Sequence, residues 1–141
     1  MKLGLSIRWC VAIVGFFAVG TASACSCRHI GAENLVRDKQ LSLARIAVMP
    51  PTFTERIASL LDFFEESRTY RVRVIEVITG QYDATVIEVL SSGPAACGIE
   101  LRPGKTYYHR TGPAVAGKPL QASVCNFVDE GYVRQVKAYT Q

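Results

Sequence analysis

Short stretches of the chain alternate hydrophobic and polar positions with the two-residue period of a β-strand. Tyrosine and valine alternate with arginine over 70–74, and a similar alternation runs over 85–90. A mostly apolar run over 43–49 predicts another strand, which ends at two prolines because proline cannot continue a strand ladder. At 75–78 the alternation blurs, as it does at a bulge or in a stretch buried on both faces. Further short strands are predicted over 99–101, 106–108 and 122–125.

Two other stretches have the spacing of amphipathic helices. The first is 52–67, in which Thr52 and Glu55 have the spacing of a capping box. Its apolar residues gather on one face: Phe53, Ile57, Leu60, Leu61 and Phe64. Because its polar face is mainly acidic, we expect the apolar face to pack on the domain's own core and not on a membrane surface. The second helix is predicted after Asp129, an N-cap residue, with Tyr132, Val133, Val136 and Tyr139 at helical spacing.

These elements predict an all-β domain with added helices. Turns are expected at 79–81 and 103–104, and a break at 91–94. A loop is expected over 112–119, and a loop or short helix over 28–42. Five or six short strands with one inserted and one C-terminal helix favour a small closed barrel or a sandwich.

The first 24 residues have the three parts of a secretory signal peptide. A basic start is followed by an uncharged run over 9–20, and small residues at Ala22 and Ala24 precede a cysteine. The run is shorter than the roughly 20 apolar residues of a membrane-spanning helix. We therefore expect 1–24 to be removed on export, which leaves 25–141 as one secreted or periplasmic domain.

Four of the five cysteines lie in this expected domain: Cys25, Cys27, Cys97 and Cys125. An even count in an exported domain indicates disulfides. A bond between Cys25 and Cys27 would close a tight, strained ring, and both other connectivities tie the N-terminus to the 97 and 125 regions. A zinc site made from all four is an alternative, although it lacks paired C-x-x-C spacing. Lipidation of Cys25 is another, but it would leave Cys27, Cys97 and Cys125 as an odd set, in which one cysteine has no partner.

Several segments occur in the order that they have in one known family. They are Cys25-Ser26-Cys27, Tyr70-x-Val72-x-Val74 ending at Gly80, Ser91-Ser92 through Ala96-Cys97-Gly98-Ile99, Gly104-Lys105-x-Tyr107 and Cys125-Asn126-Phe127. Over most of 25–128 the chain thus resembles the N-terminal domain of the tissue inhibitors of metalloproteinases, and more broadly a netrin-like module. The resemblance implies a closed five-stranded barrel of the oligonucleotide/oligosaccharide-binding fold. It also implies two crossed disulfides, Cys25 to Cys97 and Cys27 to Cys125.

The resemblance further implies inhibition of a zinc metalloendopeptidase. In that family the free α-amine and the carbonyl of the first cysteine chelate the zinc of the protease. This assigns the chelate to Cys25, the residue in the specificity pocket to Ser26, and the next cleft position to Arg28. The adjoining ridge would comprise Ala95, Ala96 and Cys97. The chain lacks the third bridge of the vertebrate inhibitors in this domain, and the helix expected over 52–67 has no counterpart in the family.

The alternative is a non-inhibitory netrin-like module that binds a polysaccharide, a peptide or a cell-surface partner. Tyr107 and Tyr108 are its candidate contacts. No enzyme and no cofactor are expected, because no nucleophile motif or metal-binding pair surrounds His29 or His109, the only two histidines, and full cysteine pairing leaves no free thiol. Removing 1–24 takes away two basic residues and lowers the formal charge from +4 to +2, which disfavours nucleic acid as a partner. The domain is expected to be a monomer.

Overall fold

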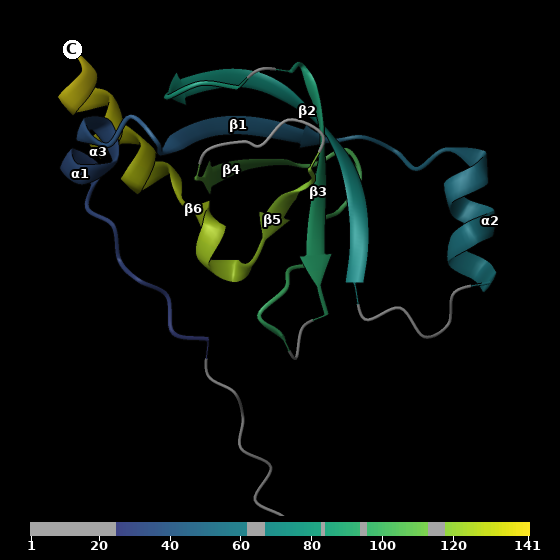
Figure 1. Cartoon of the computed structure of the whole chain (residues 1–141). Coiled ribbons are helices and arrows are strands. Elements are labelled where there is room, and N and C mark those ends of the chain that lie inside the picture. Colours follow the sequence, from purple (N-terminus) through teal and green to yellow (C-terminus); the bar gives the residue numbers. More distant parts are fainter. Residues whose placement is uncertain (1–24, 62–66, 83, 94–95, 113–117) are drawn as a thin grey trace, which may run out of the picture.

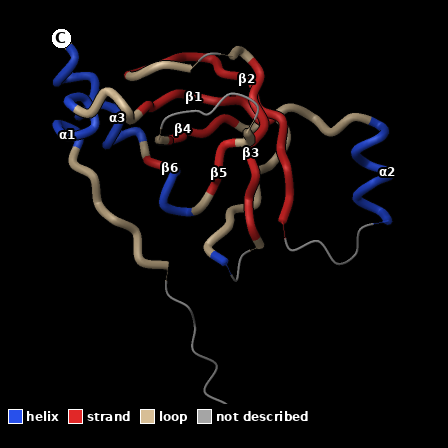
Figure 2. Tube along the Cα trace, viewed as in Figure 1, coloured by secondary structure: helices blue, strands red, loops and turns tan. Residues whose placement is uncertain are grey.

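The fold is a curled six-stranded sheet with two helices packed at one end (Figure 1). The computed structural model describes residues 25–61, 67–82, 84–93, 96–112 and 118–141. The strands are β1 Ser42–Val48, β2 Ser67–Thr79, β3 Val86–Ser92, β4 Thr106–Thr111, β5 Leu120–Ala122 and β6 Phe127–Val128. The helices are α1 Ala32–Arg37, α2 Phe53–Leu61, the 3-10 helix η2 Val124–Asn126, and α3 Glu130–Thr140. Figure 2 shows how the strands curl around a common interior.

The sheet is a half-barrel, so the prediction of a closed five-stranded barrel is wrong. Its strand order is β5-β3-β2-β1-β4-β6, in which only β3 and β5 are parallel. No ladder joins β5 to β6 in the described part of the chain. These end strands have three and two residues, and the four residues 123–126 carry the chain from one edge of the sheet to the other. The short edges leave too little backbone to close the barrel by strand pairing.

Side chains link the two ends of the half-barrel in place of a ladder. The side-chain amide of Asn126 donates to the carbonyl of Arg110 at 3.0 Å, which joins η2 to β4. Nε2 of His109, also on β4, lies 3.4 Å from the carbonyl oxygen of Gln121 on β5. The hydroxyl of Tyr82 donates to the carbonyl of His109 at 3.2 Å. Three segments, which are the stretch around Tyr82, β4, and the continuous stretch from β5 through η2, therefore meet at the open side of the sheet.

Two irregularities in β2 divide the side chains of the sheet between two cores. Val74 pairs with Ile46 and Glu76 with Arg45, so Ile75 is an extra residue on β2. A second register shift follows where Thr79 pairs with Leu43. Of the two alternatives predicted for 75–78, a bulge and a stretch buried on both faces, the register shows the bulge. Such a bulge reverses which alternate residues face inward.

The inner core lies within the curled sheet and the outer core lies between the sheet and helices α1 and α3. The buried residues of the inner core are Ala44, Ile46, Val48, Val72, Val89, Leu101, Leu120 and Ala122. Those of the outer core are Ala32, Leu35, Leu43, Val133 and Val136. Helix α3 begins at the predicted N-cap, where the Asp129 carboxylate accepts from Tyr132 N at 2.8 Å. Lys137 of α3 donates to Glu76 of β2 at 2.7 Å, which lowers the pKa of that carboxyl and holds the helix on the sheet.

Several predicted elements have other bounds or another form. Residues 99–101 form no strand, and the only pairing there is a single bridge from Gly98 to Ser123. The strand expected over 122–125 is instead the end of β5 followed by η2, because Ser123 and Asn126 cap a helical turn. Residues 113–117 of the expected loop lie outside the described residues.

Helix α2 forms as predicted, but its apolar face does not pack on the core. The capping box is present, since Thr52 N donates to the Glu55 carboxylate and Glu55 N to the Thr52 hydroxyl. Phe53 is 78% exposed, Ile57 43% and Leu60 67%. Phe64 lies outside the described residues, and Ser67 already belongs to β2. Figure 1 shows the helix standing apart from the sheet.

Candidate functional site

Residues 25–30 form an exposed segment without helix or strand, which we call the N-terminal strip (tan in Figure 2). Cys25 is bonded to Cys97 and Cys27 to Cys125. These are the two bonds that the family resemblance implies, and they leave no place for a four-cysteine zinc site. At the far end of the strip, the Tyr132 hydroxyl donates to the carbonyl oxygen of Ile30 at 2.7 Å. Three cross-links therefore hold six residues.

Both disulfides end on neighbouring parts of the backbone. Val124 N donates to the carbonyl oxygen of Cys97 at 2.9 Å, and Gly98 forms a bridge with Ser123. Backbone hydrogen bonds thus join the Cys97 and Cys125 segments directly, independently of the two disulfides. Cross-linking to two segments that are themselves joined leaves the strip little freedom to move, so its geometry is set before any partner binds.

The Cys97 segment is a tight turn with an unusual backbone. Ala96 N and Gly98 N both donate to the carbonyl oxygen of Gly93, at 2.9 and 3.1 Å. Cys97 has φ of 63°, a left-handed conformation that costs a non-glycine residue roughly 1–2 kcal/mol. Gly98 is required by space, since a Cβ there would lie 1.4 Å from the carbonyl oxygen of Ser92. The turn presents Ala96 to solvent while Cys97 is half-buried.

A buried serine fixes this turn to β3. The hydroxyl of Ser91, which is 2% exposed, accepts from Ile99 N and donates to Ile99 O, each at 2.8 Å. One side chain thereby satisfies both polar groups of a residue that has no strand partner. The interior placement of a serine is explained by these bonds, because a buried hydroxyl without a partner is costly.

The Cys125 segment is held by a second polar cluster. Ser123 Oγ accepts from Cys125 N at 3.3 Å, and Ser123 N donates to the side-chain oxygen of Asn126 at 3.0 Å. The Arg110 guanidinium donates to the carbonyl oxygen of Cys125 at 3.0 Å and lies 6.0 Å from the centre of the Tyr132 ring. Tyr132 in turn holds Ile30, so one chain of contacts runs from the Cys27–Cys125 disulfide through β4 and α3 to the end of the strip at Ile30.

The structure brings together most of the residues predicted for the site. Ser26, Cys27 and Arg28 are exposed along the strip and Cys25 is half-buried beside the Cys97 turn. Ala96 and Cys97 lie in that turn, and Ala95 lies outside the described residues. The sequence reasoning missed the residues that support the strip: Ser91, Arg110, Ser123 and Tyr132. Only Ser123 gave a local signal, through its capping spacing to Asn126.

Three other residues singled out from the sequence, Tyr107, Tyr108 and His109, lie side by side on β4. Tyr107 is half-buried, with its ring 5.7 Å from Phe127 and its hydroxyl accepting from Arg102 N. Tyr108 packs against the outer core. His109 is fully buried, and this burial lowers its pKa to about 4. Tyr107 and Tyr108 thus keep part of their surface accessible and His109 does not, whereas His29 is exposed on the strip.

The described ranges contain no cluster of three or more histidine, cysteine or acidic side chains that could hold a metal ion. Within the same ranges, no helix is long and apolar enough to cross a membrane. A scan against models of known protein families gave no match, and a search of curated proteins gave none either. The case for a function therefore rests on the strip and on its resemblance to the metalloproteinase inhibitors.

Proposed function

We propose that the processed protein inhibits a zinc metalloendopeptidase through the α-amine and the carbonyl oxygen of Cys25. The observation that carries the proposal is the strip itself, which is exposed at Ser26, Cys27 and Arg28 and yet cross-linked at both cysteines. An exposed segment that is already ordered loses little conformational entropy on binding. Cleavage after Ala24 would place the free amine on the residue whose side chain is bonded to the Cys97 turn.

The chemistry of the terminus suits the zinc of a protease. Catalytic zinc keeps one coordination position for water, and a neutral amine is a good nitrogen ligand. An α-amine has an ordinary pKa of about 7.7–8.0, so protons compete with zinc below that range. Inhibition should therefore weaken as the pH falls below about 8. The amine and carbonyl of one residue can bind the same ion as a chelate.

The neighbouring residues would fill the substrate cleft around that zinc. Ser26 is small enough to enter a specificity pocket without a clash, and Arg28 continues along the cleft. Ala96 and Cys97 would form the described part of the adjoining ridge. Because the Cys97 turn is held by Ser91 and Gly98, this ridge would keep its place beside Cys25 in the complex.

The experiment is inhibition of a panel of zinc endopeptidases by the mature, oxidised protein, with a serine protease as the specificity control. Acetylating the amine of Cys25, or leaving one alanine before it, should abolish inhibition. A matched control carries one alanine after Gln141, at the exposed C-terminus, and should inhibit like the parent. Equal potency of the two extended proteins would refute the mechanism.

A second candidate is the non-inhibitory module, in the form of a peptide-binding domain. An open hollow of about 360 Å³ lies between the end of β2 and the segment that follows it, lined in part by Ile75, Val77 and Tyr82. Ile75 and Val77 are 43% and 44% exposed there. Binding that is lost in Val77→Asp and unaffected by an alanine before Cys25 would favour this function over inhibition.

A further inference from the structure

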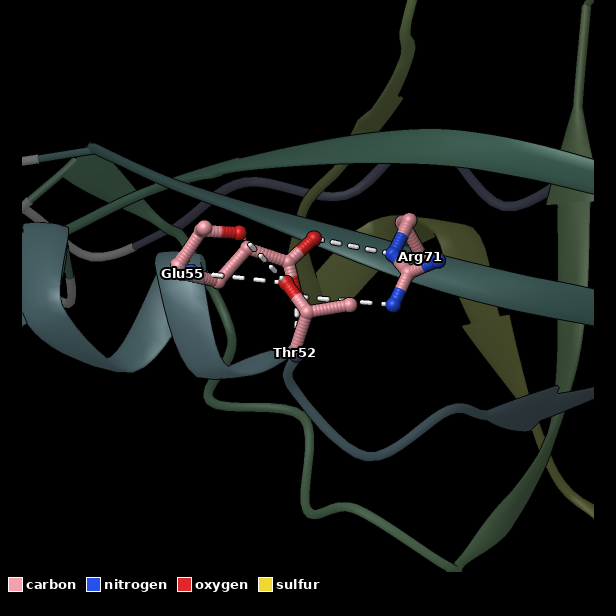
Figure 3. Close-up of polar contacts among 4 residues, drawn as sticks. Thr52, Glu55 and Arg71 are labelled. Atoms are coloured by element: carbon pink, nitrogen blue, oxygen red, sulfur yellow. Dashed lines mark hydrogen bonds and ion pairs between the residues drawn. The ribbon is translucent and has the colours of Figure 1, made fainter.

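Helix α2 is attached to the rest of the protein by its polar face. The Glu55 carboxylate accepts from the Arg71 guanidinium on β2, at 2.8 Å from Nε and 3.5 Å from Nη2 (Figure 3). The same carboxylate accepts from the backbone N–H of Thr52, and these bonds lower its pKa. The first turn of the helix is therefore fixed at once to its own cap and to the sheet.

The attachment turns the apolar face of the helix outward. At about 100° per residue, Phe53, Ile57 and Leu60 lie within one narrow sector, and Glu55 lies on nearly the opposite side. All three apolar side chains are exposed, Phe53 most of all at 78%. An amphipathic helix normally buries this face. Here the ion pair holds the face away from the core, in the orientation that a binding partner would require.

We infer that the α2 stripe, defined as Phe53, Ile57 and Leu60, docks into an apolar groove with an acidic rim on a partner protein. The spacing of the stripe, i, i+4 and i+7, is that of helices that bind in grooves. Arg56 flanks the stripe on one side, is exposed, and forms no ion pair with any described residue. A carboxylate at the rim of the groove would complement it.

The size of the stripe favours a groove over a second copy of the same helix. The three side chains together offer roughly 300 Å² of apolar surface, whereas a stable interface takes about 800 Å² from each partner. Two stripes packed face to face would bury only that small area. A groove also encloses the flanks of the helix, including Thr54 and Arg56, and so buries more of the same nine residues.

This contact goes beyond the proposed inhibition and does not depend on it. The stripe lies on the connection between β1 and β2, whereas the inhibitory strip precedes α1. The disulfides and the Tyr132 bond tie the strip to Cys97, Cys125 and α3, whereas α2 is tied to Arg71 of β2. The two surfaces can therefore be tested separately: blocking the amine of Cys25 should leave docking of α2 intact, and changing the stripe should leave zinc chelation intact.

Site-specific photocrosslinking in the cells that produce the protein tests the inference. The full-length chain carries p-benzoylphenylalanine in place of Ile57, and a matched chain carries it in place of Ser59 on another side of the helix. We expect one protein adduct from position 57 and at least ten times less from position 59. The crosslinked peptide, identified by mass spectrometry, should line an apolar groove with an aspartate or glutamate at its rim.

Further substitutions in the position-57 chain test the chemistry of the contact. Leu60→Asp and Arg56→Glu should each lower the adduct yield at least tenfold, and Arg56→Lys should retain it. An unchanged unfolding midpoint shows that each variant still folds. An adduct with a second copy, an adduct with lipid alone, equal labelling from position 59, or full yield from Arg56→Glu would each overturn the inference. So would the absence of any adduct from position 57.

Discussion

The hydroxyl of Tyr132 donates a 2.7 Å hydrogen bond to the carbonyl oxygen of Ile30, a residue 102 positions earlier in the chain. This bond is the third cross-link of the N-terminal strip and the only one of the three that is not covalent. Tyr132→Phe should therefore loosen the end of the strip while both disulfides remain. The expected cost in unfolding free energy is about 1 kcal/mol, which is typical of one hydrogen bond.

The measurement is hydrogen exchange across 28–32, together with urea unfolding. Tyr132→Phe should speed exchange in 28–32 more than in α3. Tyr139→Phe is the matched control on the same helix, because Tyr139 is 57% exposed. If the two variants exchange alike in the strip, the Tyr132 bond has no part in ordering it.

Glycine 98 provides a sharp test of the Cys97 turn. Gly98→Ala would place a Cβ 1.4 Å from the backbone oxygen of Ser92, and neither group can move without breaking the bonds of the turn. We expect a loss of about 1–3 kcal/mol in unfolding free energy, the usual range for overpacking. Gly112→Ala is the control, since its Cβ would meet nothing within 4 Å. Equal midpoints for the two variants would show that the turn is not as tight as described.

The local features of the fold were predictable because neighbouring residues determine them. The caps at Thr52 and Asp129 and the bulge within 75–78 all depend on short-range spacing, and all are present. The open sheet was not predictable in this way. It depends on β5 and β6 being too short to pair, and strand bounds of two or three residues leave little trace in hydrophobic periodicity.

Helix α2 shows a second limit of pattern reasoning. Its amphipathic spacing predicts correctly that a helix forms, but not which face meets the protein. That choice depends on the ion pair between Glu55 and Arg71, residues on different elements. The candidate site shows the same limit. Its cysteines are visible in the sequence, but Arg110 and Tyr132, which support the strip, come from β4 and α3, and no local pattern predicts their contacts.

The two disulfides should each contribute substantially to stability. They span 72 and 98 positions, and the loop-entropy model gives about 4–5 kcal/mol for bridges of this length. We expect the double variants Cys25→Ser/Cys97→Ser and Cys27→Ser/Cys125→Ser to lower the unfolding free energy in urea by comparable amounts. Only the first pair should also abolish inhibition outright, because it removes the bond at the chelating residue. Inhibition that survives the first pair and fails in the second would contradict this assignment.

Stability should also depend on pH through His109. Burial lowers the pKa of His109 to about 4 in the folded protein, and an unfolded histidine titrates near 6.5. Between these values the unfolded state binds the additional proton, so unfolding free energy rises with pH across this window and is lost as pH falls. The full loss from pH 6.5 to 4 is about 3 kcal/mol. The lowered pKa values of Glu55 and Glu76 act at lower pH, which leaves pH 5–6.5 to the histidine.

Urea midpoints at half-unit steps between pH 5 and 7 measure this dependence. His109→Gln should flatten the slope in this window, whatever it does to stability at pH 7. His29→Gln is the matched control, since His29 is the other histidine and is exposed on the strip. A slope that persists in His109→Gln would assign the titration to another group. Because Nε2 of His109 faces the carbonyl oxygen of Gln121, Nε2 carries the hydrogen of the neutral ring, and the added proton goes to Nδ1, which is buried without a hydrogen-bond partner among the described residues. Protonation should therefore first disturb β4 around His109, and exchange at 108–110 should rise before global unfolding.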